Sequence, residues 1–217
     1  MDAQQIQDKI YEKGYGKVAD HIGFLYTIYR SSDGDNPIQP ANIIGEIKVA
    51  PTTTWTWMMV KKYGDSTWIL VVDGRGLEVG DYLVGELRTF FIASMEKILP
   101  ILGVMCDRKI TIVRPKTTEG IGDVGYSGYV QGDASTFDVL HTSVPSSFLK
   151  SSRGEKNPVK LPTDAKMPWY AVYLPQWDSV FLRNGDIIID ENQQDYIISD
   201  NEHTPLGWHL NVHGLEA

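Results

Sequence analysis

The sequence predicts a mainly β protein that has an N-terminal α-helix and two small β-barrel or β-sandwich modules related by an internal repeat. Three observations lead to this fold class. Residues 3–22 have the apolar spacing of a helix, β-branched and aromatic runs dominate the chain after residue 24, and one strand-turn-strand unit occurs twice.

The N-terminal segment is predicted to form an amphipathic helix. Its apolar residues recur at spacings of four or eight, as on one helix face: Ile6, Ile10, Val18 and Ile22. Gly14 and Gly16 each cost such a helix about 1 kcal/mol, so we expect it to need a neighbour to pack on. The candidate subunit-interface residues of this segment are Ile6, Ile10, Tyr11 and Tyr15.

The rest of the chain is predicted to be mostly strands separated by turn residues. The expected strands are 24–30, 42–49, 67–73, 81–84, 89–94, 103–114, 169–174, 185–190, 195–199 and 207–212. Glycine, serine, proline and lysine dominate between about 115 and 165, which predicts a long connector with one short helical turn at 146–150. The expected division is therefore a helix and first strand (1–30), a first β module (31–115), a connector (116–165) and a second β module (166–217).

The internal repeat is the most specific pattern in the sequence. Leu77-x-x-Gly80-Asp81 followed by Phe91-Ile92-x-Ser94 recurs as Leu182-x-x-Gly185-Asp186 followed by Tyr196-Ile197-x-Ser199, with the same offset at every matched position. In each copy a glycine permits a tight turn, an aspartate can bond the amides of the turn, and a β-branched or aromatic strand follows. The repeat predicts two related β modules, or two matching corners of one.

Composition and charge restrict the classes of function. The formal net charge of −8 argues against a general nucleic-acid coat, because phosphate binding requires a cationic surface. The single cysteine, Cys106, leaves no internal disulfide and is interpreted as a buried structural thiol. No apolar stretch is long enough for a membrane span, and the N-terminal residues lack an apolar signal core, so we expect assembly in the cytoplasm.

Three short patterns resemble sites, and each has a simpler explanation. Residues 120–125 match G-x-G-x-x-G but lack a following helix, so a loop is favoured over a cofactor site. Ser147-x-x-Lys150 lacks the accompanying motifs of penicillin-recognising enzymes. The last strand alternates Trp208, Leu210 and Val212 with His209, Asn211 and His213, which predicts a core face and a solvent face, not a metal site. We therefore expect no catalytic residue, cofactor, metal or small-molecule substrate.

Two further segments are candidate contact surfaces. The first is the run of large apolar residues Trp55, Trp57, Met58 and Met59, since aromatic and methionine side chains are enriched at the centres of interfaces. Ordinary core packing is the alternative. The second is a basic loop, which would contact an acidic subunit or DNA or else be merely solvated: Lys150, Arg153, Lys156 and Lys160.

The stretches YEKGYGKVADHIGFLYTIYR (11–30), WILVVDGRGLEVGDYLVGELRTFFIASMEKILPILGVMCDRKITIVRP (68–115), WYAVYLP (169–175) and LRNGDIIIDENQQDYIISDNEHTPLGWHL (182–210) resemble a structural protein from the head-to-tail gene clusters of contractile-tailed bacteriophages. The repeated GD unit is also similar to the β-barrel of phage head-closure (stopper) and head-tail joining proteins. This resemblance implies a homo-oligomeric ring in the neck of the virion, with portal, neck or tail subunits as partners and no catalysis. A double repeat and an N-terminal helix depart from the one-barrel stopper pattern.

Two other assignments stay open at this level. The chain could serve at the tail end or baseplate, or it could be a carbohydrate- or receptor-binding β module in which exposed tryptophans stack on sugar rings. A hydrolase is a third class, and it predicts activity that depends on Ser147 or His203.

Overall fold

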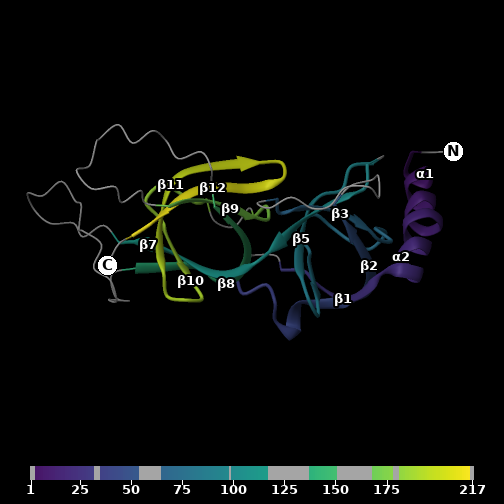
Figure 1. Ribbon diagram of the computed structural model, residues 1–217, viewed down its shortest axis with the longest axis horizontal. Helices are drawn as coiled ribbons and strands as arrows, with labels where there is room; N and C mark the ends of the chain where they lie inside the picture. Colours follow the sequence, from purple (N-terminus) through teal and green to yellow (C-terminus); the bar gives the residue numbers. More distant parts are fainter. Residues whose placement is uncertain are drawn as a thin grey trace, which may run out of the picture.

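The computed structural model of the chain describes residues 3–31, 35–53, 65–97, 99–116, 137–150, 168–177 and 181–215. Within these ranges the protein consists of one N-terminal helix followed by two closed β-barrels, each of six strands. The helix lies at one end of the long axis and the second barrel at the other, with the first barrel between them (Figure 1).

The N-terminal helix is continuous but changes its winding in the middle. It consists of α1 (Ala3–Lys9), a π-helical segment η1 (Ile10–Gly16) and α2 (Lys17–Ile22). The glycines at positions 14 and 16 lie inside the π-helical segment. Gly23 is extended and ends the helix, and the first strand starts at the next residue.

The first barrel closes on itself through pairing of its first and fourth strands, β1 and β4. All neighbouring strands are antiparallel, and their spatial order is β1-β2-β3-β6-β5-β4. A short 3-10 helix, η2 (Pro40–Asn42), leads into the second strand. The strands are β1 (Phe24–Tyr29), β2 (Ile43–Thr52), β3 (Thr67–Val71), β4 (Tyr82–Gly85), β5 (Thr89–Ser94) and β6 (Ile101–Cys106).

The second barrel repeats this topology strand for strand. Its order is β7-β8-β9-β12-β11-β10, and pairing of β10 with β7 closes it. The strands are β7 (Arg108–Pro115), β8 (Phe137–Lys150), β9 (Trp169–Leu174), β10 (Ile187–Asp190), β11 (Asp195–Thr204) and β12 (Gly207–Gly214). The predicted fold class, mainly β with an N-terminal helix and two repeated modules, is therefore confirmed.

The strand placement differs from the expected division at three points. Residues 24–29 were expected outside the first module, together with the helix, but they form β1 of the first barrel. Residues 108–115 were expected to end the first module, but they form β7 and pair only with strands of the second barrel among the described residues. Residues 137–150 were expected in a connector, with a helical turn near Ser146, but they form β8, the longest strand. Ser147 accordingly lies in a strand and is buried.

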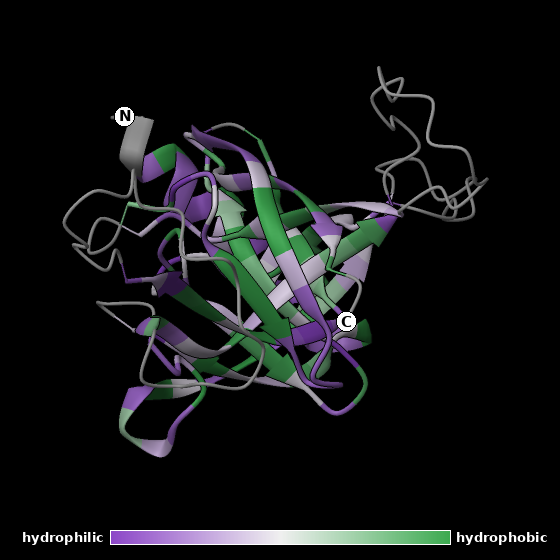
Figure 2. Cartoon of the chain, turned by 90° about the vertical axis from the view of Figure 1, so that its left-hand side faces the viewer, coloured by the Kyte–Doolittle hydropathy of each residue, from purple (hydrophilic) through white to green (hydrophobic). Residues whose placement is uncertain are grey.

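Each barrel has its own apolar interior. The core of the first is built around Leu70, Phe90 and Ile92, and that of the second around Ile112, Val172 and Trp208. Side chains alternate between the inside and the outside of each strand, so every second residue contributes to a core. Apolar residues accordingly concentrate along the strands in Figure 2.

The two copies of the repeat align in the structure with one change of register. The N–H of Gly80 donates to the carbonyl of Ile92, and the N–H of Gly185 donates to the carbonyl of Ile198. Ile92 therefore corresponds to Ile198 and not to Ile197, because the turn between β10 and β11 has one more residue than the turn between β4 and β5. A shift by one residue exchanges the two faces of a strand. In the sequence repeat, Phe91 and Ile92 are therefore aligned with residues that point to the opposite side of the second barrel.

Candidate functional site

The repeated aspartate is a structural residue in both barrels. Asp81 accepts hydrogen bonds from Nε and Nη2 of Arg30, both 2.7 Å long, and Asp186 accepts the same pair from Arg114, both 2.8 Å long. Each carboxylate also accepts one backbone N–H at 2.8 Å, that of Glu78 or that of Arg183. Both aspartates are almost completely buried. Each GD turn is thus fixed to the first strand of its own barrel by a two-bond ion pair.

The glycine before each aspartate has the backbone conformation that the sequence predicts. Gly80 has φ +94° and Gly185 has φ +92°, a region that L-residues with side chains rarely adopt. The two arginines were not predicted, because they lie 51 and 72 residues from their partners. The only local signal is that each arginine stands at or just after the end of the first strand of its barrel.

The two barrels are joined by a single residue, Asp107, and by an apolar contact. The outer side chains Tyr82, Phe91, Ala93 and Val104 of the first barrel form one buried cluster with Tyr173 of the second packed against it. Tyr82 Oη donates a hydrogen bond of 3.1 Å to the carbonyl of Pro145, and burial raises the pKa of this phenol. An apolar cavity of about 210 Å³ lies beside this cluster, between the barrels.

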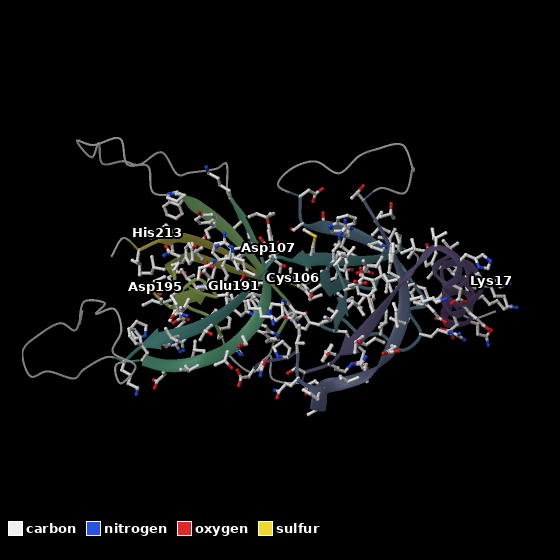
Figure 3. All side chains as sticks on the ribbon, turned by 60° about the horizontal axis from the view of Figure 1, so that its bottom comes forward. Lys17, Cys106, Asp107, Glu191, Asp195 and His213 are labelled. Atoms are coloured by element: carbon white, nitrogen blue, oxygen red, sulfur yellow. The ribbon has the colours of Figure 1, made fainter. Side chains whose placement is uncertain are left out.

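The linker residue is itself bound to the second barrel. The Asp107 N–H donates to the carbonyl of Ser146 at 3.0 Å, and its carboxylate accepts the N–H of Phe148 at 2.6 Å. Cys106 and Asp107 lie at the junction of the barrels, far from Lys17 on the helix (Figure 3). Burial, with a further contribution from the charge of Asp107, raises the pKa of the Cys106 thiol. Cys106 is half-buried, not fully buried as predicted, and it packs against the apolar cluster at the junction.

A third attachment between the barrels uses the segment that follows β1. The carboxylate of Asp35 accepts hydrogen bonds from the N–H and the hydroxyl of Thr142 in β8, each 2.7 Å long, and the N–H of Asn36 donates to the Thr142 carbonyl at 2.9 Å. With the apolar cluster and the bound linker, this contact makes three separate attachments. These attachments hold the two barrels against each other.

The helix candidates fall into different environments. Tyr11 is 4% exposed and belongs to the core of the first barrel, while Ile6 is 46% exposed. Ile10 and Tyr15 are half-buried, and Tyr15 packs against the same core. Tyr11 is therefore a residue of the intramolecular contact between the helix and the barrel, which corrects its assignment to a subunit interface; Ile6 remains a candidate.

Several exposed apolar residues lie near the point where the helix meets the first barrel. Phe24 is 66% exposed, Leu25 58% and Leu87 85%. The register pairs Tyr26 with Gly85, so the turn that carries Leu87 lies beside the start of β1. Ile22, at the end of the helix, is also exposed. We refer to Ile22, Phe24, Leu25 and Leu87 as the rim patch.

A groove of about 890 Å³ runs next to the rim patch, between the helix and the first barrel. Its walls are the helix, the strand β2 and the segment after β3, and Leu25 of the rim patch also lines it. Charged side chains of both signs surround it, including Glu12, Arg75 and Lys48. Lys48 Nζ donates to the carbonyl of Asp20 at 3.1 Å across this groove.

The remaining predicted contact residues are only partly described. Trp55, Trp57, Met58 and Met59, and the basic residues Arg153, Lys156 and Lys160, lie outside the described residues, as does the G-x-G-x-x-G match at 120–125. Lys150 is the last residue of β8, is exposed, and pairs with Tyr170. The basic loop therefore begins directly at the end of a barrel strand.

The tryptophans that the structure describes are mostly internal. Trp68, Trp177 and Trp208 are buried, and the half-buried Trp169 packs against the His213 ring, with 4.9 Å between ring centroids. Stacking on a sugar requires an exposed ring face. These four residues therefore give no support to a carbohydrate-binding surface.

The C-terminal histidines lie on the outer face of β12, as predicted, and Trp208, Leu210 and Val212 face the core. His209 stacks on Tyr173 at 4.9 Å, with its Nδ1 3.7 Å from a carboxylate oxygen of Glu202. His213 Nδ1 lies 2.6 Å from the hydroxyl of Ser199. In the described ranges, no group of three or more His, Cys, Asp or Glu side chains is arranged to hold a metal ion.

His213 is expected to make the stability of the second barrel depend on pH. Burial lowers its pKa from the ordinary 6.5, because the imidazolium loses hydration. The unfolded chain therefore takes up this proton before the folded chain does as the pH falls. The contribution of His213 to the free energy of unfolding is complete above pH 6.5 and is lost as the pH falls through its lowered folded pKa.

Replacing this residue, His213→Gln, keeps a polar side chain but removes the titration. We expect the decrease in the free energy of unfolding below pH 6.5 to become shallower in the variant. Urea unfolding of both proteins at a series of pH values between about 5 and 8 measures this. The same pH dependence in the two proteins would contradict the prediction.

Comparison with known proteins gives no match to this chain, whether with protein-family models, with curated proteins or with solved structures. Among the described residues, no helix is both long enough and apolar enough to pass through a membrane.

Proposed function

We propose that the chain is a structural subunit of a contractile-tailed phage particle that forms a homo-oligomeric ring at the head-to-tail junction. The observation that carries this proposal is the set of exposed apolar residues called the rim patch on the double barrel. Leu87, Phe24 and Leu25 are the three most exposed of these apolar side chains, and their backbone positions lie near the start of β1, with Phe24 and Leu25 on opposite faces of the strand. Clustered exposed apolar residues mark contact surfaces between proteins.

Two closed barrels attached to each other suit a subunit that contacts different neighbouring proteins at its two ends. Both barrels are closed by strand pairing, and three attachments hold them against each other. The two buried aspartates of the repeat fix turns: Asp81 pairs with Arg30, and Asp186 pairs with Arg114. These features support a role in assembly through protein–protein contacts.

The phage assignment rests on the resemblance of the sequence over the segments 11–30, 68–115, 169–175 and 182–210. The two barrels provide the β units that this resemblance implies, each with its own GD turn. Portal, neck and tail subunits are the proposed partners. Assembly at the tail end or in the baseplate is the alternative place in the same particle, since it would use the same contact surfaces.

Labelling of whole particles distinguishes these positions. Gold-labelled antibody against this chain, applied to phage particles from cells that produce it, is expected to mark the junction between head and tail. Label at the far end of the tail would favour the baseplate alternative. Particles without any label, together with a purified chain that stays monomeric in sedimentation at all concentrations, would contradict an assembly role.

The rim patch can be tested in the purified chain. The double substitution Leu25→Glu and Leu87→Glu places charges on exposed positions and is expected to weaken self-association at least about ten-fold, because contacts near the centre of an interface carry most of its energy. Val139→Glu, at an exposed position of the second barrel, is the matched control. If the unchanged chain, the double variant and the Val139→Glu control self-associated with equal affinity, the rim patch would not be the contact surface.

A further inference from the structure

The strand β2 has one edge that no other strand covers. Residues 43–49 pair with β1 on one side, whereas pairing with β3 on the other side involves only residues 50–52. On that second side, residues 43–48 therefore have no strand partner within the described part of the chain. An uncovered strand edge presents backbone N–H and C=O groups that can bond another chain.

This edge opens into the groove beside the helix. Glu46, Ile47 and Lys48 all line the groove, although they are consecutive residues. Consecutive side chains of a strand point to opposite faces, so the groove can contact all three only along the edge of the strand. The opposite walls come from the helix and from the segment after β3, at Gly16, Asp20 and Arg75 among others. One wall of the groove is therefore formed by the edge of β2.

The second barrel shows what binds at the corresponding edge. Ile28 pairs with Gly45 in the first barrel, and the equivalent Ile112 pairs with His141 in the second, so the edge near Glu46 corresponds to the edge near Thr142. Both backbone groups of Thr142 are bonded there to Asp35 and Asn36, which belong to the first barrel. At this position of the second barrel, beside a β-bulge, a strand edge binds the carboxylate of Asp35 and the N–H of Asn36 from the first barrel of the same chain.

We propose that the β2 edge, residues 43–48, is a docking site for a second copy of this chain, which adds an extended segment along this edge. Addition of a strand gives affinity through main-chain hydrogen bonds, and the groove accommodates the side chains. Ile43 and Ile44, both exposed at the start of the strand, provide apolar contacts beside the edge. A site of this kind joins different surfaces of the two copies and therefore generates a ring when the rotation closes. The inference names the contact of the oligomer in the proposed function and rests on it.

Hydrogen exchange of the intact chain tests the docking site. The amides of residues 43–48 are compared in dilute solution, where the chain is monomeric, and in concentrated solution, where it associates. We expect exchange of those amides in 43–48 that point away from β1 to slow at least about ten-fold on association, because the new hydrogen bonds must open before exchange occurs. Association without added protection at 43–48 would overturn this inference and leave the ring proposal intact. A chain that is monomeric at every concentration would overturn both.

A charge placed next to the edge provides a second measurement. Ile44→Lys is expected to weaken self-association at least about ten-fold, since lysine on an edge strand opposes strand addition. Val139→Lys is the matched control, because Val139 is an exposed β-branched residue of β8, the strand that corresponds to β2. Unchanged thermal unfolding verifies that both variants fold. Equal weakening by the two substitutions, or none by either, would contradict docking at the β2 edge.

Discussion

Asp186→Ala is expected to lower the free energy of unfolding by about 3 kcal/mol, because removal of one partner leaves a largely desolvated charge without compensation. Asp186 is 2% exposed and accepts three hydrogen bonds, two from Arg114 and one from the N–H of Arg183. The Arg114 side chain is 24% exposed, so partial hydration keeps the loss at the lower end of the range for buried pairs. Asp81→Ala is expected to have a similar effect in the first barrel, since Asp81 has the same contacts.

Chemical denaturation with urea measures the effect, and Asp138→Ala is the matched control. Asp138 also pairs with a cation, Lys116 at 3.3 Å, but its side chain is 61% exposed. An exposed pair contributes at most about 1 kcal/mol, so the control should change little. If Asp186→Ala and Asp138→Ala lowered the free energy of unfolding equally, the stability of the GD turns would not depend on the buried ion pairs. The repeated aspartate would then need another explanation.

Tyr11→Ala is expected to cost about 3 kcal/mol, because deletion of a large buried ring removes apolar contacts and leaves a cavity. The ring packs closely on the barrel: a methyl group added at Gly74 would come within 2.8 Å of it. The phenol also accepts a hydrogen bond of 3.1 Å from Gln7 of the helix. Loss of the ring should therefore detach the helix from the first barrel as well as destabilise the core.

The control for this prediction is Ile6→Ala, on the same helix. Ile6 is 46% exposed, and substitutions at such positions usually change stability by less than about 0.5 kcal/mol. Far-ultraviolet circular dichroism reports the helix content, and chemical denaturation reports the free energy of unfolding. Both are measured at a concentration where the chain is monomeric. If Tyr11→Ala left stability unchanged and reduced only self-association, Tyr11 would be an interface residue, as the sequence alone predicts.

The sequence predicts the fold class because its repeat depends on local chemistry. A glycine that must adopt a positive φ, followed by an aspartate that bonds the turn, can be recognised within a few residues, and both copies have the predicted conformation. These turn residues do not determine how the following strands, β5 and β11, align with each other. One extra residue in a turn shifts the register, and only the hydrogen bonds of Ile92 and Ile198 reveal the shift.

The strand β8 was not predicted because it lacks regular alternation. It contains Pro145, Ser143 has a positive φ of 50°, and its pairing with β7 shifts register twice. Such bulges interrupt the period of two on which strand prediction depends. The same irregular region receives Asp35 and Asn36, so the residues that obscure the strand are those that join the barrels.

The candidate surfaces were predicted in part. Apolar spacing identified the helix, but spacing does not distinguish Tyr11, which enters the barrel core, from Ile6, which does not. Leu87, the most exposed apolar residue of the rim patch, belongs to a turn and carries no periodic signal. The uncovered edge of β2 is a property of strand order and length, which local sequence does not encode.

The arrangement of the two barrels along the chain has a consequence for synthesis. The last strand of the first barrel ends at Cys106 and the first strand of the second begins at Arg108, so no strand is exchanged between them. The first barrel can therefore fold while the second is still on the ribosome, as is general for N-terminal domains. During this interval Phe91, Ala93 and Val104 face solvent, and Asp35 has no Thr142 to bind. A product that ends near residue 106 is therefore expected to expose these apolar side chains and to aggregate more readily than the full chain.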